Sequence, residues 1–322
     1  MRLLITGASG FIGSYLIKHL KNHYEVGCIL LPQEKIEFSE DIKIFYGDIT
    51  KPETLIVPAK WPDMVVHGAG IIKAFKTSDF YRINAEGTKN LIQALQRYKK
   101  NLRFFLFFSS CSVTGPVNDI SKPPEEGSPA HPMGHYAISK YQAEQYVRNS
   151  TLPFTIFRIC SVYGGGSKEY IDYFKLASKR IKPKVGSKIR YSDMIHAEDL
   201  SRCVKIALDH YKKLDILYNI TDGQHYSWDE ISDAISSTYD TKMVRVFFPV
   251  FLFYLVGLLT SIYSKIVRYP SLLTIEKVKF LNMKAWIANS SKFRNQFEIE
   301  DFTSLKEGFK QAKTWYIDHN WI

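Results

Sequence analysis

A glycine-rich turn that begins at residue 7 is the feature that most constrains how this chain can fold. The apolar segment Leu3–Thr6 precedes the turn, which has the spacing GxxGxxG. Glycines permit a tight turn and let backbone N–H groups approach a pyrophosphate, while the helix that follows directs its positive end at that anion. The spacing therefore predicts a dinucleotide site, whose expected contacts are Gly7, Ser9, Gly10, Phe11, Ile12 and Gly13.

The first half of the chain alternates short apolar runs with helical patterns, which is typical of βαβ units around a parallel sheet. Strands are predicted at Arg2–Thr6, Val26–Leu30, Ile42–Tyr46, Met64–His67, Phe104–Ser109 and Phe154–Ile159. Helices between and after them are predicted at Ile12–Asn22, Thr88–Lys99 and Tyr136–Asn149. From about Gly164 onward this alternation weakens.

These patterns predict an α/β fold: a Rossmann-type doubly wound parallel sheet with a smaller, mostly helical C-terminal substrate-binding region. We expect residues 1–163 to form the NAD(P)-binding domain, with residues of roughly 190–222 returning to it. Residues 164–322 are expected to form the substrate-binding and C-terminal region.

Composition excludes several other classes of protein. The 322 residues are 45% apolar and 23% charged, which is ordinary for a globular protein, and the first strand begins at residue 2, so we expect cytoplasmic synthesis without a signal peptide. Lysine and arginine exceed the acidic residues by 43 − 32 = 11, yet no zinc spacing or RNA-binding signature accompanies them, so we expect no nucleic-acid partner. No metal site is expected, because the cysteines are isolated at Cys28, Cys111, Cys160 and Cys203.

Five ordered motifs make the chain similar to the extended short-chain dehydrogenases/reductases, also called the NAD-dependent epimerase/dehydratase family. Thr6–Gly13 resembles the nucleotide fingerprint of that family, and the resemblance covers roughly residues 1–200. It implies that the cofactor is NAD or NADP and that further contacts come from Asp48, Ile49, Ala69, Gly70, Asn84, Ile159 and Cys160. Ile159 stands where the family usually has proline, and residues 28–32, at the end of the second strand, carry no acidic residue or arginine to distinguish the two cofactors.

Tyr136 and Lys140 form the YxxxK pattern on a predicted helix, where positions i and i+4 share one face. A phenol normally titrates near pH 10, and a neighbouring ammonium favours the phenolate and lowers that pKa. Tyr136 is therefore the predicted acid/base for hydride transfer to or from nicotinamide. The resemblance implies that Lys140 also holds the ribose and that Ser110 bonds the reacting oxygen, with Ser109 and Ser112 as alternatives.

Three departures from the sugar-nucleotide members favour another substrate. Thr114 replaces a tyrosine, Ser161 stands where asparagine is usual, and Ser192 replaces an arginine that pairs with a diphosphate, although Arg190 could substitute. The predicted function is therefore a secondary alcohol/ketone oxidoreductase acting on an apolar cyclic substrate that is sterol-, terpenoid- or flavonoid-like. The alternatives are a nucleotide-sugar 4-epimerase or dehydratase acting on a UDP- or dTDP-sugar, and a non-catalytic NAD(P)-binding protein.

The uncharged run Val246–Ser264 carries several aromatic residues and has basic flanks. It is long enough to reach the lower limit for a membrane span, but it contains Pro249 and Gly257. It predicts a buried helix or a lid over the active site, a peripheral membrane contact, or a span. Family members often form homodimers through two helices that correspond to Thr88–Tyr98 and Tyr136–Arg148, so a homodimer is expected as well.

Overall fold

The computed structural model describes residues 1–34, 36, 39–267 and 275–322, and the side chains of 261–277 lie outside this description. The chain divides into two compact units. The first comprises Met1–Gly115, Glu126–Ile159 and Leu200–Ile220, and the second Pro116–Glu125, Cys160–Asp199 and Thr221–Ile322. The domain boundaries expected from the sequence stay predictions, because compact units need not fold independently.

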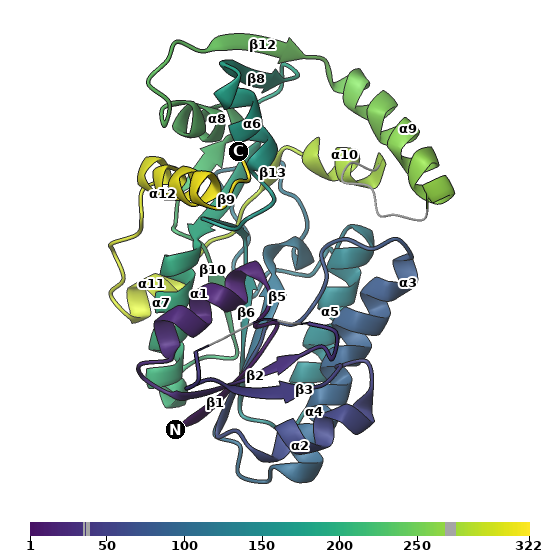
Figure 1. The fold of residues 1–322 in the computed structure, drawn as a ribbon, viewed down its shortest axis with the longest axis vertical. Helices are drawn as coiled ribbons and strands as arrows, with labels where there is room; N and C mark the ends of the chain where they lie inside the picture. The colour runs from purple at the N-terminus through teal and green to yellow at the C-terminus, as the bar shows by residue number, and fades with distance from the viewer. Residues whose placement is uncertain (35, 37–38, 268–274) are drawn as a thin grey trace. The chain divides into compact units, whose positions relative to one another are not determined.

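The first unit contains a seven-stranded parallel sheet in the order β10-β6-β5-β4-β1-β2-β3 (Figure 1). Its strands are β1 Arg2–Thr6, β2 Glu25–Leu30, β3 Lys43–Tyr46, β4 Met64–His67, β5 Phe104–Ser110, β6 Phe154–Ile159 and β10 Leu217–Ile220. The six predicted strands are confirmed within one residue at each end. The direction of strand succession reverses between β1 and β4, which is where open parallel sheets bind ligands beyond their carboxyl ends.

Helices cover both faces of this sheet, with α1 on one side and the contacting pair α4 and α5 on the other (Figure 1). The helices are α1 Phe11–Leu20, α2 Ile56–Lys60, α3 Thr77–Phe80, α4 Gly87–Tyr98, α5 Gly134–Arg148 and α7 Ala197–Asp209, with a π-helical segment at Tyr81–Glu86 and 3₁₀ turns at Pro52–Leu55, Cys111–Val113 and Tyr211–Lys213. Strand β5 is buried throughout residues 104–109 because both of its faces are covered. The predicted Rossmann-type sheet is confirmed.

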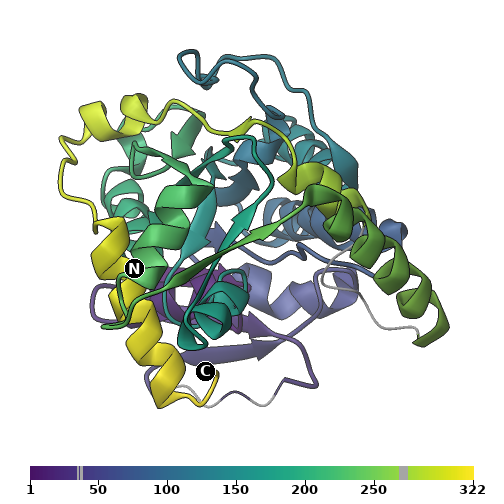
Figure 2. The same ribbon diagram turned by 90° about the horizontal axis from the view of Figure 1, so that it is seen from above.

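The second unit contains strands as well as helices. A four-stranded sheet has β9 Tyr191–His196 pairing with β7 Ser161–Tyr163, β11 His225–Ser227 and β13 Ala285–Trp286, and β8 Ile181–Val185 pairs with β12 Val244–Phe248. Its helices are α6 Ile171–Ser178, α8 Trp228–Ser236, α9 Val250–Val267, α10 Ile275–Leu281, α11 Ser291–Gln296 and α12 Leu305–Asp318. Figures 1 and 2 place α9 and α12 at opposite ends of this unit. Helices predominate, as expected, but the sequence did not predict the small sheets.

Candidate active site

The glycine turn between β1 and α1 has the backbone shape that the spacing predicts. Gly7 has φ +75°, and a Cβ added there would lie 2.8 Å from the backbone nitrogen of Ala69. A Cβ on Gly13 would lie 2.2 Å from the carbonyl oxygen of Gly7, so neither position accepts a side chain. Helix α1 begins at a glycine N-cap, Gly10, without a side-chain acceptor for its first N–H groups. These N–H groups fit an anion such as a pyrophosphate.

A buried histidine, His67, connects the end of β1 with the first turn of α4. The Ala69 N–H donates to Thr6 Oγ1 (3.1 Å), whose hydroxyl lies 2.6 Å from His67 Nδ1. Thr88 Oγ1 donates to the Asn84 carbonyl (2.6 Å) and lies 2.9 Å from His67 Nε2. Thr88 must therefore accept from Nε2, which places a proton on Nε2 of His67. Burial lowers the pKa of His67 to about 3, so the ring is neutral and carries this proton alone.

Asn84 lies in the π-helical segment and joins the loop after β4 to the helix that carries Tyr136. Its Nδ2 donates to the Ile71 carbonyl and to Ser139 Oγ, both at 3.0 Å, and its Oδ1 accepts from the Ile71 N–H at 2.8 Å. The Ser139 hydroxyl in turn donates to the Tyr136 carbonyl at 2.7 Å. A Cβ on Gly70 would lie 2.9 Å from Asn84 Oδ1, so this close approach also requires glycine. Asn84 thereby fixes the backbone of the loop after β4 and, through Ser139, the backbone of α5 at Tyr136.

Tyr136 and Lys140 lie one turn apart on α5, and their environments differ. Tyr136 is half-buried, with its ring centroid 6.3 Å from that of Phe80 in an edge-on arrangement. Lys140 is buried, and its Nζ lies 4.3 Å from the centroid of the Phe107 ring on β5. Burial lowers the pKa of Lys140 to about 7, and the negative charge of Glu144 opposes this shift. Glu144 therefore favours the charged form of the lysine.

Glu144 is fully buried and receives three hydrogen bonds from two strands. Arg158 of β6 donates through Nε and Nη2 to the two carboxylate oxygens, both at 2.8 Å. The Ser109 hydroxyl at the end of β5 donates to Glu144 Oε1 at 2.6 Å. This two-pronged geometry is the strongest arrangement available to an arginine and a carboxylate. It holds α5 against the carboxyl ends of β5 and β6.

The three candidate serines differ in the hydrogen bonds that they make, and these bonds distinguish their roles. The Ser109 proton is committed to Glu144, and Ser112 donates to Ser110 Oγ from both its N–H (3.2 Å) and its hydroxyl (2.9 Å). Ser110 is half-buried and accepts both bonds, which leaves its own hydroxyl proton to donate elsewhere. Ser110 is thus the serine best prepared to bond a reacting oxygen.

The remaining predicted cofactor residues lie at strand ends or in the core. Asp48 Oδ1 accepts from the N–H and the hydroxyl of Thr50, both at 2.8 Å, and so closes the turn after β3. The side chain of Ile49 is buried in the core cluster between the sheet and α4. Ile159 ends β6 and is buried, and Cys160 follows it half-buried. Among the described residues no three His, Cys, Asp or Glu side chains are placed to hold a metal ion.

Sequence reasoning missed the roles of His67 and Glu144. Glu144 follows Lys140 by four residues, so the shared helix face was a signal that its charge acts on the lysine. No local pattern shows that Arg158, fourteen residues further along the chain, completes the pair.

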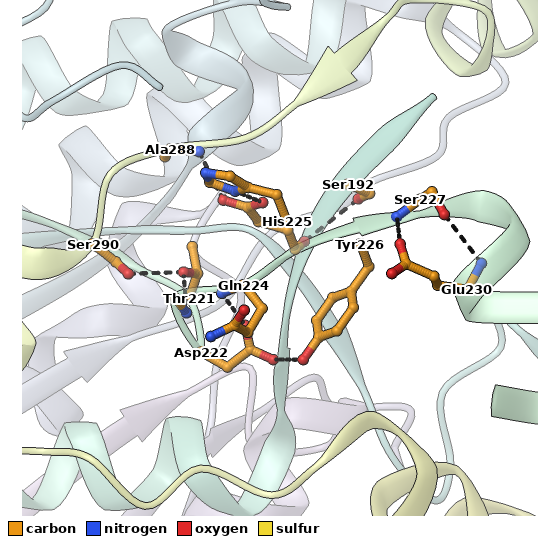
Figure 3. A network of polar contacts seen from close by, with 12 residues as sticks. Ser192, Thr221, Asp222, Gln224, His225, Tyr226, Ser227, Glu230, Ala288 and Ser290 are labelled. Atoms are coloured by element: carbon orange, nitrogen blue, oxygen red, sulfur yellow. Dashed lines mark hydrogen bonds and ion pairs between the residues drawn. The ribbon is translucent and has the colours of Figure 1, made fainter. Parts of the chain in front are cut away.

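A second polar network, shown in Figure 3, lies within the second unit. Asp193 Oδ1 on β9 lies 2.6 Å from His225 Nδ1 on β11, and its Oδ2 accepts from the Ala288 N–H (2.9 Å). Burial raises the pKa of Asp193, whereas the bond to Asp193 raises the pKa of His225. Nearby, Asp222 accepts from the Tyr226 hydroxyl (2.8 Å), and burial raises the pKa of Asp222 to about 6. The network joins β9, β11 and the segment after β13.

Comparisons with known proteins show the family and the fold of the chain. The model of the NAD dependent epimerase/dehydratase family matches residues 3–221. The chain is 25% identical to the ceramide reductase of Caulobacter vibrioides, covering 99% of this chain and 95% of that protein. It is 24% identical to the UDP-glucose 4-epimerase of Vibrio cholerae, covering 99% and 96%. The crystal structure of the Bordetella bronchiseptica enzyme WbmH in complex with NAD⁺ has a TM-score of 0.77 at 21% identity, covering 99% of each chain.

Proposed function

The chain belongs to the NAD dependent epimerase/dehydratase family, and we propose that it interconverts a secondary alcohol and a ketone on an apolar substrate. Members of this extended short-chain type are NAD-dependent oxidoreductases, epimerases or dehydratases, and the chain is an enzyme of this kind. The observation that carries the proposal is the arrangement of Ser110, Tyr136 and Lys140. The serine, with an uncommitted proton, lies at the carboxyl end of β5, and the half-buried phenol and buried lysine lie one turn apart on α5, which packs against β5.

Each of the three side chains has a distinct role in the proposed reaction. In oxidation the phenolate oxygen of Tyr136 takes the proton of the substrate hydroxyl, and in reduction the phenol returns that proton to the carbonyl. Lys140, whose charged form Glu144 favours, lowers the pKa of the phenol. Ser110 donates its proton to the reacting oxygen and so holds it in place. The cofactor, when bound, supplies hydride transfer at its nicotinamide ring.

The glycine turn would hold the pyrophosphate of the cofactor, since Gly7 and Gly13 exclude side chains there and α1 begins without a side-chain cap. The dinucleotide is NAD, the cofactor of the family, or NADP as the predicted alternative. The proposed contacts are Gly7, Ser9, Gly10, Phe11, Ile12, Gly13, Asp48, Ile49, Ala69, Gly70, Asn84, Tyr136, Lys140, Ile159 and Cys160. For Ile49 we expect a backbone contact, because its side chain packs in the core.

Two observations support an apolar substrate over a sugar nucleotide. Arg190, the candidate partner for a diphosphate, is buried and donates to the carbonyl of Val185 (2.8 Å) and to Asn282 Oδ1 (2.6 Å). Thr114, where the sugar enzymes have tyrosine, is buried and donates to the Cys111 carbonyl (2.8 Å). The similarity to a ceramide reductase over nearly the whole chain points the same way and adds sphingolipids to the sterol-, terpenoid- and flavonoid-like candidates.

The decisive experiment replaces Tyr136 by phenylalanine. Loss of the acid/base should lower kcat/KM by about 10²- to 10⁴-fold, while the Kd for NAD changes little. Tyr146→Phe is a matched control on the same helix, because the Tyr146 hydroxyl donates to Glu86 Oε1 (2.7 Å) and takes no part in the proposed chemistry. Turnover that survives in Tyr136→Phe would contradict the assignment.

The nucleotide-sugar alternative is favoured by the similarity to a UDP-glucose 4-epimerase and makes opposite predictions. A redox-neutral epimerase would retain its cofactor tightly and would be stabilised thermally by UDP or dTDP. The oxidoreductase should instead change nicotinamide absorbance steadily with an apolar alcohol and show no shift in Tm with either nucleotide. A non-catalytic NAD(P)-binding protein would do neither.

The proposed setting of the enzyme is cytoplasmic, with peripheral membrane contact through Val246–Ser264 and a homodimer formed by α4 and α5. Membrane contact suits a substrate that dissolves in a bilayer rather than in water. Light scattering on the purified chain, compared with variants of exposed residues on α4, tests the dimer. Peripheral rather than spanning contact is proposed because no helix in the described part of the chain is both long and apolar enough to cross a membrane.

A further inference from the structure

Helix α9 presents an entirely apolar face to solvent. The exposed positions follow helical spacing over two neighbouring rows, and their side chains are between 38% and 66% exposed. We call this surface the α9 face; it consists of Phe251, Leu252, Leu255, Val256, Leu258 and Leu259. A helix on the surface of a water-soluble domain normally carries charged or polar residues at such positions. The expectation of a buried helix is therefore wrong for this side of α9.

The opposite side of α9 is also apolar and packs within the second unit. Val250 lies against the turn after β8, where a Cβ on Gly186 would approach its Cγ2 to 2.6 Å. The ring of Phe253 lies 6.4 Å from that of Phe248, and Gly257 is buried. The α9 face is therefore the outer surface of a helix whose inner surface is already occupied.

Strand β12 extends the exposed apolar surface along the chain. Val244 and Phe247 are more than half exposed. Among the described side chains, eight of the seventeen large exposed apolar ones lie within residues 244–259. Apolar residues scattered singly on a surface need no explanation, but a contiguous patch marks a site of interaction.

The charges along this stretch of the sequence have one sign, and the acidic partner of Arg245 comes from another element, Asp229 of α8 (3.1 Å). From residue 241 to residue 275 the sequence contains no acidic residue, and its basic residues are Lys242, Arg245, Lys265 and Arg268. A two-fold contact between copies of the chain would bring this surface against itself and set like charges beside each other. An apolar helix with basic flanks instead matches a bilayer interface that carries anionic headgroups.

We propose that the α9 face docks the enzyme on an anionic phospholipid bilayer. The helix lies in the plane of the interface, with its six exposed side chains at the boundary between headgroups and acyl chains, and anionic headgroups attract the positive charge of this part of the sequence. The inference rests on the peripheral membrane contact proposed above and deepens it, because it names the docking face and the lipid charge, and it holds whichever substrate the enzyme uses.

Sedimentation with vesicles tests the proposal on the full-length chain. Vesicles of phosphatidylcholine with phosphatidylglycerol should carry the protein down, vesicles of phosphatidylcholine alone should carry down much less, and added salt should reduce the difference. The combined variant Leu255→Gln, Leu258→Gln and Leu259→Gln should lower partitioning at least about 10-fold. The matched control is Ile189→Gln, Ile216→Gln and Ile317→Gln, which changes three equally exposed residues outside the α9 face and should bind as the wild type does.

Hydrogen exchange locates the contact without any substitution. Anionic vesicles should slow amide exchange in peptides from α9, whose carbonyls and N–H groups become shielded from water, and leave α12 at the other end of the unit unchanged (Figure 2).

Three outcomes overturn the proposal: no sedimentation of the wild type with anionic vesicles, equal sedimentation of the α9-face variant, or a wild-type dimer that this variant converts to monomers without a change in vesicle binding. The last result would assign the surface to a second copy of the chain. Tyr136→Phe should bind vesicles normally, so failure of the docking proposal and failure of the proposed chemistry are distinguishable.

Discussion

Glu144 in the first unit and Asp193 in the second are both fully buried carboxylates, and they are neutralised by different partners. Glu144 faces Arg158, which is charged at every accessible pH and meets both carboxylate oxygens. Asp193 faces His225, whose side chain is 30% exposed and whose charge is lost as the pH rises through its raised pKa. The first unit therefore holds α5, the helix of the proposed catalytic residues, with a permanent ion pair, whereas the second joins its strands with a pair that titrates.

The positions of the two pairs explain the difference. Glu144 lies one turn after Lys140, so its charge both anchors α5 and favours the charged form of the lysine. A partner that lost its charge would leave the carboxylate buried without compensation. Asp193 bonds strand residues on two sides, His225 and Ala288, and no proposed catalytic group depends on it. A change in its pairing alters the stability of the small sheet, not the proposed reaction.

Removing the charge of Glu144 should change stability more than any other substitution in either pair. Glu144→Gln leaves the Arg158 guanidinium buried without a counter-charge, and we expect it to lower the free energy of unfolding by about 3–5 kcal/mol. Urea denaturation of the purified variant measures this loss. Glu86→Gln is the control, because Glu86 forms a largely exposed pair with Lys89 (3.1 Å) and should cost no more than about 1 kcal/mol. Equal losses of unfolding free energy in the two variants would show that the pair of Glu144 and Arg158 does not anchor α5.

The same substitution should change the pH dependence of turnover. Lys140 has a pKa of about 7 with Glu144 present, and loss of that negative charge lowers the pKa further. The ammonium is the active form in the proposed reaction. On the alkaline side, kcat/KM of the variant should therefore begin to fall about one pH unit lower than kcat/KM of the wild type. The pH profile of kcat/KM measures the shift, and an unchanged alkaline limb would mean that Glu144 does not act on Lys140.

The contrast between the two pairs also shows which parts of the structure the sequence can predict. Periodicity and the glycine spacing report on neighbours along the chain, so β1 to β6 and the turn at Gly7 were predicted closely. The choice of Ser110 over Ser109 needed the structure, because it depends on the bond from Ser109 to Glu144. Neither buried ion pair could be predicted, since each joins residues of different elements.

The apolar run Val246–Ser264 shows a second limit of predicting structure from the sequence. The sequence presents it as one continuous segment, but the structure divides it at Pro249 into the end of β12 and the start of α9. Proline removes a backbone donor and therefore suits the boundary between a strand and a helix. Which side chains of α9 are exposed depends on what packs against Val250 and Phe253, and hydrophobicity alone does not report it.

The smallest effect on stability is expected for the pair of His225 and Asp193. His225 has a raised pKa in the folded state because of its bond to Asp193. Its contribution to stability is therefore fully present below the pKa of the unfolded chain, about 6.5, and is lost as the pH rises through the higher folded value. His225→Gln should be less stable than the wild type at about pH 5 by less than about 1 kcal/mol, because the side chain is partly exposed and screened.

At about pH 9 the imidazole is neutral in both states, and the variant and the wild type should unfold at the same urea concentration. The control is Glu86→Gln, whose difference from the wild type should stay constant between these two pH values, because its ion pair with Lys89 is intact at both. A difference between His225→Gln and wild type that grows with pH would reverse the sign of the argument and show that burial of the ring, rather than its bond to Asp193, sets the pKa of His225.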